Sequence, residues 1–414
     1  MKYESYKDSG VEWIGKVPSH WVVAAFKRKI TINNGKDYKD FLDEEIYPVM
    51  GSGGCFAYCS KYMFDGEALL LGRKGTIDKP LYINGKFWAV DTMFYATPHK
   101  DLNCKFAYYL ALTFPFQLYS TSTALPSMTQ TDLGNNPVAF PPIVEQQAIA
   151  LYLDKKCEEI DRAIDTQKKK IELLNELKQT IITNAVTKGL NPEAQMKDSG
   201  VAWIGEVPNH WEVCKTLHCL SQPITDGPHE TPELFPEGIP FVSAEAVSCG
   251  NGSIDFNHIR GFISEKYYHE CCKKYTPQKD DVYMIKSGAT TGKVAIVDTD
   301  IKFTIWSPLA VFRCDQQKML PKFLFHSLTC PFYQVQVELG WNYGTQQNIG
   351  MRTLEKLYLI VPPINEQHDI LSYLDKKLAD VNSQISKTFR RIELLQELKQ
   401  SIITEAVTGK IKVC

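Results

Sequence analysis

The sequence lacks a charge excess of either sign. It has 46 Lys and Arg residues against 48 Asp and Glu residues, a formal net charge of −2 over 414 residues. Much of the affinity of a DNA-binding protein comes from basic side chains that neutralise phosphates. The overall charge therefore does not point to a polyanionic partner. Any DNA contact must come from local clusters of basic side chains, from added contacts by partner proteins, or from both.

Long hydrophobic segments are also missing. No uninterrupted run of about 18 apolar residues occurs, as a membrane-spanning helix would need. The first residues, MKYESY, contain no apolar core of a secretory signal. We expect a soluble, cytoplasmic protein with no membrane partner.

Motifs for metals and nucleotide chemistry are absent as well. The 12 cysteines include no CxxC pair, and His229 has no HxH or HExxH context, so we expect reduced, mostly buried thiols and no metal site. The segment from Gly288 to Lys293 fails as a P-loop, because it has three residues between its glycines and Val294 after the lysine. No Asn/Asp-Pro-Pro-aromatic tetrapeptide is present; Pro141-Pro142 follows Phe140 and precedes Ile143.

What the sequence does contain is a long internal repeat. Residues 7–21, KDSGVEWIGKVPSHW, recur 190 positions later as KDSGVAWIGEVPNHW. Residues 141–187 begin PPIVEQQAIALYLDKK and end IELLNELKQTIITNAVT, and 221 positions later residues 362–408 repeat this pattern. The segments between these anchors differ in sequence and by 31 residues in length. Each half thus begins and ends with the same motifs but has its own central segment, called its middle below. This pattern favours a scaffold that carries two different recognition domains.

The shared C-terminal segments have the apolar spacing of a coiled coil. Pro141-Pro142 and Pro362-Pro363 prevent a helix from extending upstream, and Gly189 and Gly409 suit its end. Each helix could run for about 40 residues, or about 60 Å. The predicted seam consists of Leu153, Cys157, Ile160, Ile164, Ile171, Leu174 and Ile181 in the first copy and Leu374, Leu378, Val381, Ile385, Ile392, Leu395 and Ile402 in the second.

A helix with such a seam needs a partner to bury it. We expect the two copies to pack against each other in antiparallel fashion, with the globular middles at opposite ends and a pseudo-twofold axis that matches a DNA duplex. An ordinary helical hairpin inside a larger core remains the alternative. The predicted fold is mixed α/β: recognition domains at 1–144 and 191–365, and spacer helices at 145–190 and 366–414, which also dock partner proteins.

In the middles, short β-type runs lead into glycine-containing polar loops. Ala68–Leu71 precedes the loop GRKGT, and Val282–Ile285 precedes KSGATTGK. Glycine allows close approach to a bound surface, and Arg, Lys, Thr, Asn and Gln can contact phosphates or base edges, although each loop alone could be a plain turn. The candidate DNA contacts are Asn34, Lys36, Tyr38, Lys39, Ser52, Arg73, Lys74, Thr76, Thr225, Asp226, His229, Thr231, Lys286, Thr290, Thr291, Lys293, Gln346, Gln347 and Asn348.

With these motifs present twice, the chain resembles the specificity subunit of type I restriction-modification systems over essentially its whole length. The resemblance implies that each middle reads one half of a bipartite DNA target, and that the helices set the gap and dock methyltransferase subunits. Two modification subunits with S-adenosylmethionine and two ATP-dependent restriction subunits would then supply adenine methylation, translocation and cleavage. The resemblance implies no catalysis and no bound cofactor for this chain.

Two other functions stay open. One is a self-contained DNA methylase or nuclease, for which the cofactor motifs are lacking. The other is a coiled-coil scaffold whose globular middles bind proteins rather than DNA. Binding of S-adenosylmethionine by the isolated chain would favour the first, and a complex that assembles without sequence-specific DNA binding would favour the second.

Overall fold

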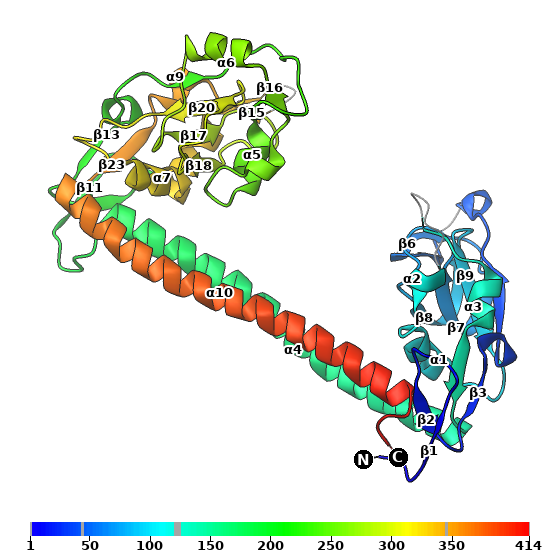
Figure 1. The fold of residues 1–414 in the computed structure, drawn as a ribbon. Coiled ribbons are helices and arrows are strands. Elements are labelled where there is room, and N and C mark those ends of the chain that lie inside the picture. Colours follow the sequence, from blue (N-terminus) through cyan, green and yellow to red (C-terminus); the bar gives the residue numbers. More distant parts are fainter. Residues whose placement is uncertain (1, 43–44, 120–125, 344–346, 414) are drawn as a thin grey trace. The chain divides into compact units, whose positions relative to one another are not determined.

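The computed structural model describes residues 2–42, 45–119, 126–343 and 347–413, and its contacts divide the chain into two units. The first unit comprises residues 1–169 and 388–414, and the second comprises residues 170–387. Two long helices, α4 (Ile143–Lys188) and α10 (Ile364–Val407), contribute one part to each unit (Figure 1). Both helices begin two residues before the predicted bounds and end before residues 190 and 414.

The repeated entry motif folds identically in the two units. It forms the hairpin β1 (Tyr6–Asp8) and β2 (Lys16–Pro18) in the first unit, and β11 (Met196–Asp198) and β12 (Glu206–Pro208) in the second. The next strand, β3 (Val22–Ala25) or β13 (Glu212–Lys215), pairs antiparallel with the strand before the long helix, β10 (Pro137–Phe140) or β23 (Tyr358–Val361). The motif tryptophans, Trp21 and Trp211, are fully buried.

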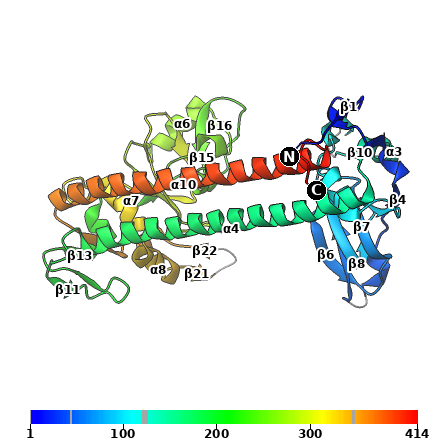
Figure 2. The same cartoon turned by 90° about the horizontal axis from the view of Figure 1, so that it is seen from below.

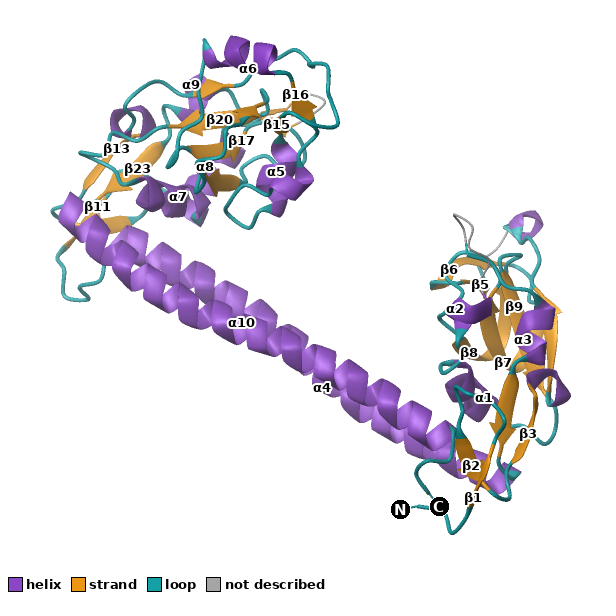
Figure 3. Cartoon of the chain, viewed as in Figure 1, coloured by secondary structure: helices purple, strands orange, loops and turns teal. Residues whose placement is uncertain are grey.

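The middle of the first unit is built on a six-stranded sheet. Its order is β4 (Ile30–Asn34), β9 (Met93–Pro98), β7 (Phe64–Gly72), β8 (Leu81–Ala89), β5 (Tyr47–Gly51) and β6 (Gly54–Cys59). Leu69 and Leu71 of β7 belong to the buried cluster that includes Phe106 of α1 (Cys104–Ala111). The short helices α2 (Phe116–Tyr119) and α3 (Gln130–Asn135) follow (Figure 3).

The middle of the second unit repeats the first four strands of this order. Its sheet runs β14 (Thr225–Asp226), β20 (Leu309–Phe312), β17 (Val282–Ile285) and β18 (Val294–Ile296), beside a smaller sheet of β16 (Phe262–Ile263), β15 (Ile239–Val242) and β19 (Thr304–Ile305). The helices are α5 (Ala244–Cys249), α6 (Glu265–Cys272), α7 (Pro321–Thr329), α8 (Pro331–Leu339) and α9 (Met351–Leu354), and β21 (Asn342–Tyr343) pairs with β22 (Gln347–Asn348). Two middles of different sequence therefore share one strand order.

The long helices pair antiparallel within each unit. In the first, Ile149 of α4 shares a buried cluster with Ala406 and Val407 of α10, while Asp161 Oδ1 lies 2.7 Å from Lys399 Nζ (Figure 2). In the second, the end of α4 shares a cluster with the start of α10, and Lys178 Nζ donates to Asn382 Oδ1 at 3.2 Å. None of the predicted seam residues is exposed. The mixed α/β fold with two antiparallel helices is confirmed.

Candidate nucleic-acid interface

In the first unit, two of the predicted loops lie against one turn. After β4, the backbone N–H of Gly35 donates to the Met93 carbonyl and that of Lys36 to the Ala89 carbonyl. After β7, the N–H of Arg73 donates to the Thr92 carbonyl at 2.9 Å. The turn between β8 and β9 therefore holds the Asn34–Lys36 and Arg73–Lys74 segments side by side.

The second unit has the same arrangement with different residues. Lys286, directly after β17, donates its backbone N–H to the Pro308 carbonyl at 2.7 Å, and Ser307 donates to the Pro228 carbonyl. Both units need glycine where the first loop meets the turn. A Cβ at Gly35 would lie 1.9 Å from the Val90 oxygen, and one at Gly227 would lie 2.1 Å from the Ile305 oxygen.

A third segment completes the site in each unit. In the first, the N–H of Met128 donates to the Arg73 carbonyl and the N–H of Gly75 to the Pro126 carbonyl. In the second, the N–H of Ile349 donates to the Lys286 carbonyl, and the N–H of Gly288 donates to the Gln347 carbonyl. The loops GRKGT and KSGATTGK thus occupy equivalent positions, as the sequence predicted. They also carry different side chains, as two readers of different DNA would require.

Most of the candidate DNA-contacting side chains reach the surface. Those classed as exposed are Asn34, Lys36, Lys39, Lys74, Thr76, His229, Thr231, Lys293, Gln347 and Asn348, and those partly buried are Tyr38, Ser52, Arg73, Thr225, Lys286, Thr290 and Thr291. Gln346 lies outside the described residues. Their contacts with bases stay predictions. The Lys293 carbonyl accepts from the N–H of Ile285, next to Lys286, but its side chain is directed to α5, where Nζ donates to the carbonyl oxygen of Ser248 at 3.3 Å.

Asp226 does not suit the direct DNA contact predicted for it. Its side chain is only 1% exposed. The carboxylate lies 2.5 Å from Lys274 Nζ, 3.1 Å from His229 Nε2 and 3.4 Å from Lys286 Nζ. A buried carboxylate with two lysine ammonium groups beside it acts through them rather than on a base.

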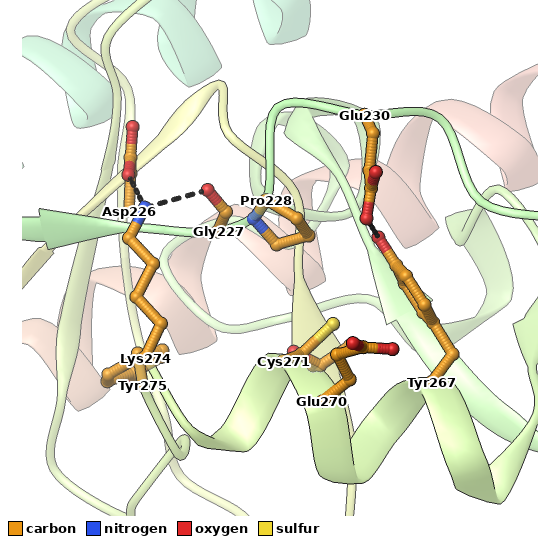
Figure 4. Close-up of a pocket in the computed structure, with 10 residues that line it drawn as sticks. Asp226, Gly227, Pro228, Glu230, Tyr267, Glu270, Cys271, Lys274 and Tyr275 are labelled. Carbon is orange, nitrogen blue, oxygen red and sulfur yellow. Dashed lines mark hydrogen bonds and ion pairs between the residues drawn. The ribbon is translucent and has the colours of Figure 1, made fainter.

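Lys274 is the residue of this cluster that sequence reasoning missed. It follows α6, 48 positions from Asp226, and its Nζ also donates to the Gly227 carbonyl at 3.2 Å. Figure 4 shows it on one side of a cavity of about 200 Å³, with Tyr267, Glu270 and Glu230 on the other. Nothing in the CCKKYTP segment distinguishes Lys274 from Lys273, so only the fold reveals the contact.

A buried polar network stiffens the wall behind this cavity. Arg313 donates from Nε and Nη2 to the two oxygens of Asp281, each at 2.7 Å. These bonds raise the pKa of Arg313, so its guanidinium stays charged. Tyr275, which lines the cavity, donates to Asp281 at 2.5 Å, and burial raises the pKa of its hydroxyl well above the usual value. Arg313 therefore stays charged and Tyr275 neutral across the physiological pH range.

Each globular middle is fixed to its long helix by one Glu-Gln pair. In the first unit, Glu145 accepts from Trp21 Nε1 at 3.1 Å, and buried Gln146 accepts from the Asn103 N–H at 2.8 Å. In the second, Glu366 accepts from Trp211 at 2.9 Å, and Gln367 accepts from the Leu320 N–H at 2.9 Å. In the PPIxEQ motif, the glutamate thus binds the entry motif to the long helix, and the glutamine binds the globular middle to it.

The long helices also present large apolar side chains outward. In the repeated IELLxELK segment, Leu173 and Leu177 of α4 are 63% and 47% exposed, and Leu394 and Leu398 of α10 are 49% and 48% exposed. Residues four apart lie on one face of a helix. The predicted seam residues are buried or partly buried instead. Docking of a partner through them stays a prediction.

Within the part of the chain that the structure describes, no group of three or more His, Cys, Asp or Glu residues could hold a metal ion. Among the same residues, no helix is both long and apolar enough to cross a bilayer.

Comparison with known proteins points to one family. The model of the type I restriction modification DNA specificity domain matches residues 19–176 and 228–391. The chain is 24% identical to the type I restriction enzyme MjaVIII specificity subunit of Methanocaldococcus jannaschii, over 96% of this chain and 94% of that protein. It is 21% identical to the type I restriction enzyme EcoBI specificity subunit of Escherichia coli, over 70% of this chain but only 62% of that protein.

The fold matches a solved structure as well. A chain from a study of complex assembly and conformational transition in the type I R-M system superposes with a TM-score of 0.69 at 17% identity. The superposition covers 95% of this chain and 99% of that chain. At this identity, the likeness supports a shared fold.

Proposed function

Because the chain belongs to the family of type I restriction-modification DNA specificity domains, we propose that it selects the DNA target of a type I restriction-modification complex. Each globular middle reads one half of a bipartite sequence. The observation that carries this proposal is the shared three-segment framework with different side chains. Asn34 and Arg73 in the first unit occupy the places of Asp226 and Lys286 in the second. One backbone platform with exchanged side chains is what two readers of different base pairs need.

The long helices set the distance between the half-sites and bind two copies of one partner. The exposed leucine pair occurs once on each helix, in the same repeated segment, so two identical apolar faces are available. The partner that fits is a methyltransferase subunit that presents an apolar helix. This chain is not a catalyst in the proposal; two modification subunits with S-adenosylmethionine methylate adenine, and ATP-dependent restriction subunits translocate and cut DNA. The complex acts in the cytoplasm, where the host DNA lies.

The test is a map of methylated adenines. The chain would be co-expressed with the modification subunit encoded beside it in a host without other methylases, and single-molecule sequencing would locate modified bases. We expect a bipartite motif with one modified adenine on each strand. A stable complex that adds no methylation would contradict the DNA-reading role and favour the protein-binding scaffold.

Loop variants would assign the half-sites. We expect Arg73→Glu with Lys74→Glu to weaken methylation through the first half-sequence, and Lys286→Glu to do so through the second, since each change removes donors and adds a charge that repels DNA. Lys188→Glu, on an exposed helix end away from these loops, is the control. Normal methylation by both loop variants would refute the loop assignment.

The partner surface would be tested by stoichiometry. Leu173→Glu with Leu177→Glu should leave a complex with one methyltransferase subunit, and the same changes at Leu394 and Leu398 should give the same result. Changing all four should abolish binding. Native mass spectrometry measures the subunit count, and two bound subunits in the fourfold variant would exclude this surface.

A further inference from the structure

Two lysine ammonium groups, of Lys274 and Lys286, face the single buried carboxylate of Asp226. Lys274 and His229 are about half and two thirds exposed, whereas Asp226 is 1% exposed. An unpaired buried carboxylate is strongly unfavourable, so the charge of Asp226 holds the ammonium groups of Lys274 and Lys286 in place. Ordering the cations before DNA arrives reduces the conformational entropy lost on binding.

The opposite wall of the cavity carries acceptors. Glu230 accepts a hydrogen bond from the Tyr267 hydroxyl at 3.3 Å, and Glu270 lines the same cavity (Figure 4). A phosphate offers acceptors only and would be repelled by these glutamates. A base pair offers acceptors and donors side by side on its major-groove edge. Donors facing acceptors across a small cavity therefore suit a base edge better than the DNA backbone.

The first unit differs at the equivalent position. Asn34, which ends β4 as Asp226 ends β14, is exposed and uncharged. An amide there can reach the surface itself. In the second unit the carboxylate is covered, so the reading group must be one of the cations that it holds.

We propose that Lys274 contacts a guanine in the second half-site, and that Asp226 is the positioning residue that fixes its ammonium group. This inference rests on the proposed function. Lysine is a common partner of guanine O6 and N7, and Nζ is tied at two points, by Asp226 Oδ1 and the Gly227 carbonyl. Lys286, with Nζ 3.4 Å from Asp226 Oδ2, is the second ammonium group that faces the carboxylate.

The test uses the complete complex and the methylation map. Lys274→Gln should relax one guanine position of the second half-sequence to other bases and leave the first half-sequence unchanged. The loss of one lysine–guanine contact corresponds to about a tenfold fall in preference for that base. The neighbouring Lys273→Gln, which removes an exposed charge from the same segment, is the matched control and should leave the motif intact.

Asp226→Asn separates positioning from general stability. We expect it to relax the same guanine position as Lys274→Gln, because the amide no longer fixes the ammonium group, while methylation still depends on the first half-sequence. A motif identical to wild type in Lys274→Gln would overturn the proposal. So would uniformly weaker methylation with an unchanged motif and a reduced salt dependence of DNA binding, which would indicate a phosphate contact. Absence of a bipartite motif in the wild-type complex would instead contradict the proposed function.

Discussion

His326 should make the second unit sensitive to acid. This residue of α7 is 4% exposed, and neither of its ring nitrogens has a hydrogen-bond partner among the described residues. Burial, helped by the positive charges of Lys322 and Lys178 and opposed by Asp375, lowers its pKa from 6.5 to about 4. The unfolded chain therefore binds a proton more readily than the folded chain, so stability is lost as the pH falls through this range.

The size of the effect follows from the two pKa values. A shift from 6.5 to about 4 corresponds to about 3 kcal/mol in full, of which about 2 kcal/mol is lost between pH 7.5 and pH 5. Replacing His326 by Phe removes the titrating group and two unpaired polar atoms. We expect the variant to gain about 2 kcal/mol relative to wild type over this pH interval.

The first unit provides the internal control. Tyr109 of α1 occupies the place of His326, and its hydroxyl donates to Asp154 at 2.9 Å, so this helix lacks the buried imidazole. Hydrogen exchange of α7 and α1 peptides, measured by mass spectrometry at pH 5 to 7.5 on both proteins, compares the two units within one chain. If the protection of α7 in wild type and His326→Phe differed by the same amount at every pH, the reasoning would be refuted.

Three further perturbations have defined outcomes. Gly409→Ala should destabilise the first unit by about 2 kcal/mol or more in thermal unfolding, because Gly409 has φ +72° and a Cβ would lie 2.3 Å from Pro18 Cδ. An unchanged melting curve would contradict the packing. Gln367→Ala should lower the stability of the second unit by about 2–4 kcal/mol, because it removes hydrogen bonds to the Leu320 N–H and to the carbonyls of Lys318 and Pro362. Hydrogen exchange of α7 measures this loss. Protection equal to that of wild type would show that water replaces the amide. Deleting one heptad from both α4 and α10 should change the spacer of the methylated motif and neither half-sequence; an unchanged spacer would disprove the ruler.

The features that could be predicted from the sequence are those that depend on repeats or on periodicity. The duplicated anchors located both helices to within two residues at their starts, because prolines and an unbroken apolar pattern leave little choice. The β-type runs before GRKGT and KSGATTGK were identified as strands, and they are β7 and β17. These features depend on local sequence, which is why they could be read without the fold.

Contacts between distant segments could not be predicted in the same way. The loop framework is held by backbone hydrogen bonds, such as Met128 to Arg73 and Ile349 to Lys286, which leave no side-chain pattern in the sequence. The burial of Asp226 and its pairing with Lys274 depend on how α6 meets β14. Nothing in the sequence relates Asp226 to Lys274, because the two residues meet only in the folded chain.

Comparison of the two units shows which contacts recur in both copies and which side chains differ between them. Residues that join the entry motif to the helix, such as Glu145 and Glu366, make the same contacts in both units and recur in both copies. Residues on the loop platform differ although their backbone positions agree, since backbone bonds tolerate exchanged side chains. In the proposed function, specificity would therefore change by substitution in the loops, while the anchors would keep partner docking and half-site spacing constant. A chain that had to recognise different DNA at its two ends through one kind of catalytic partner would need this division.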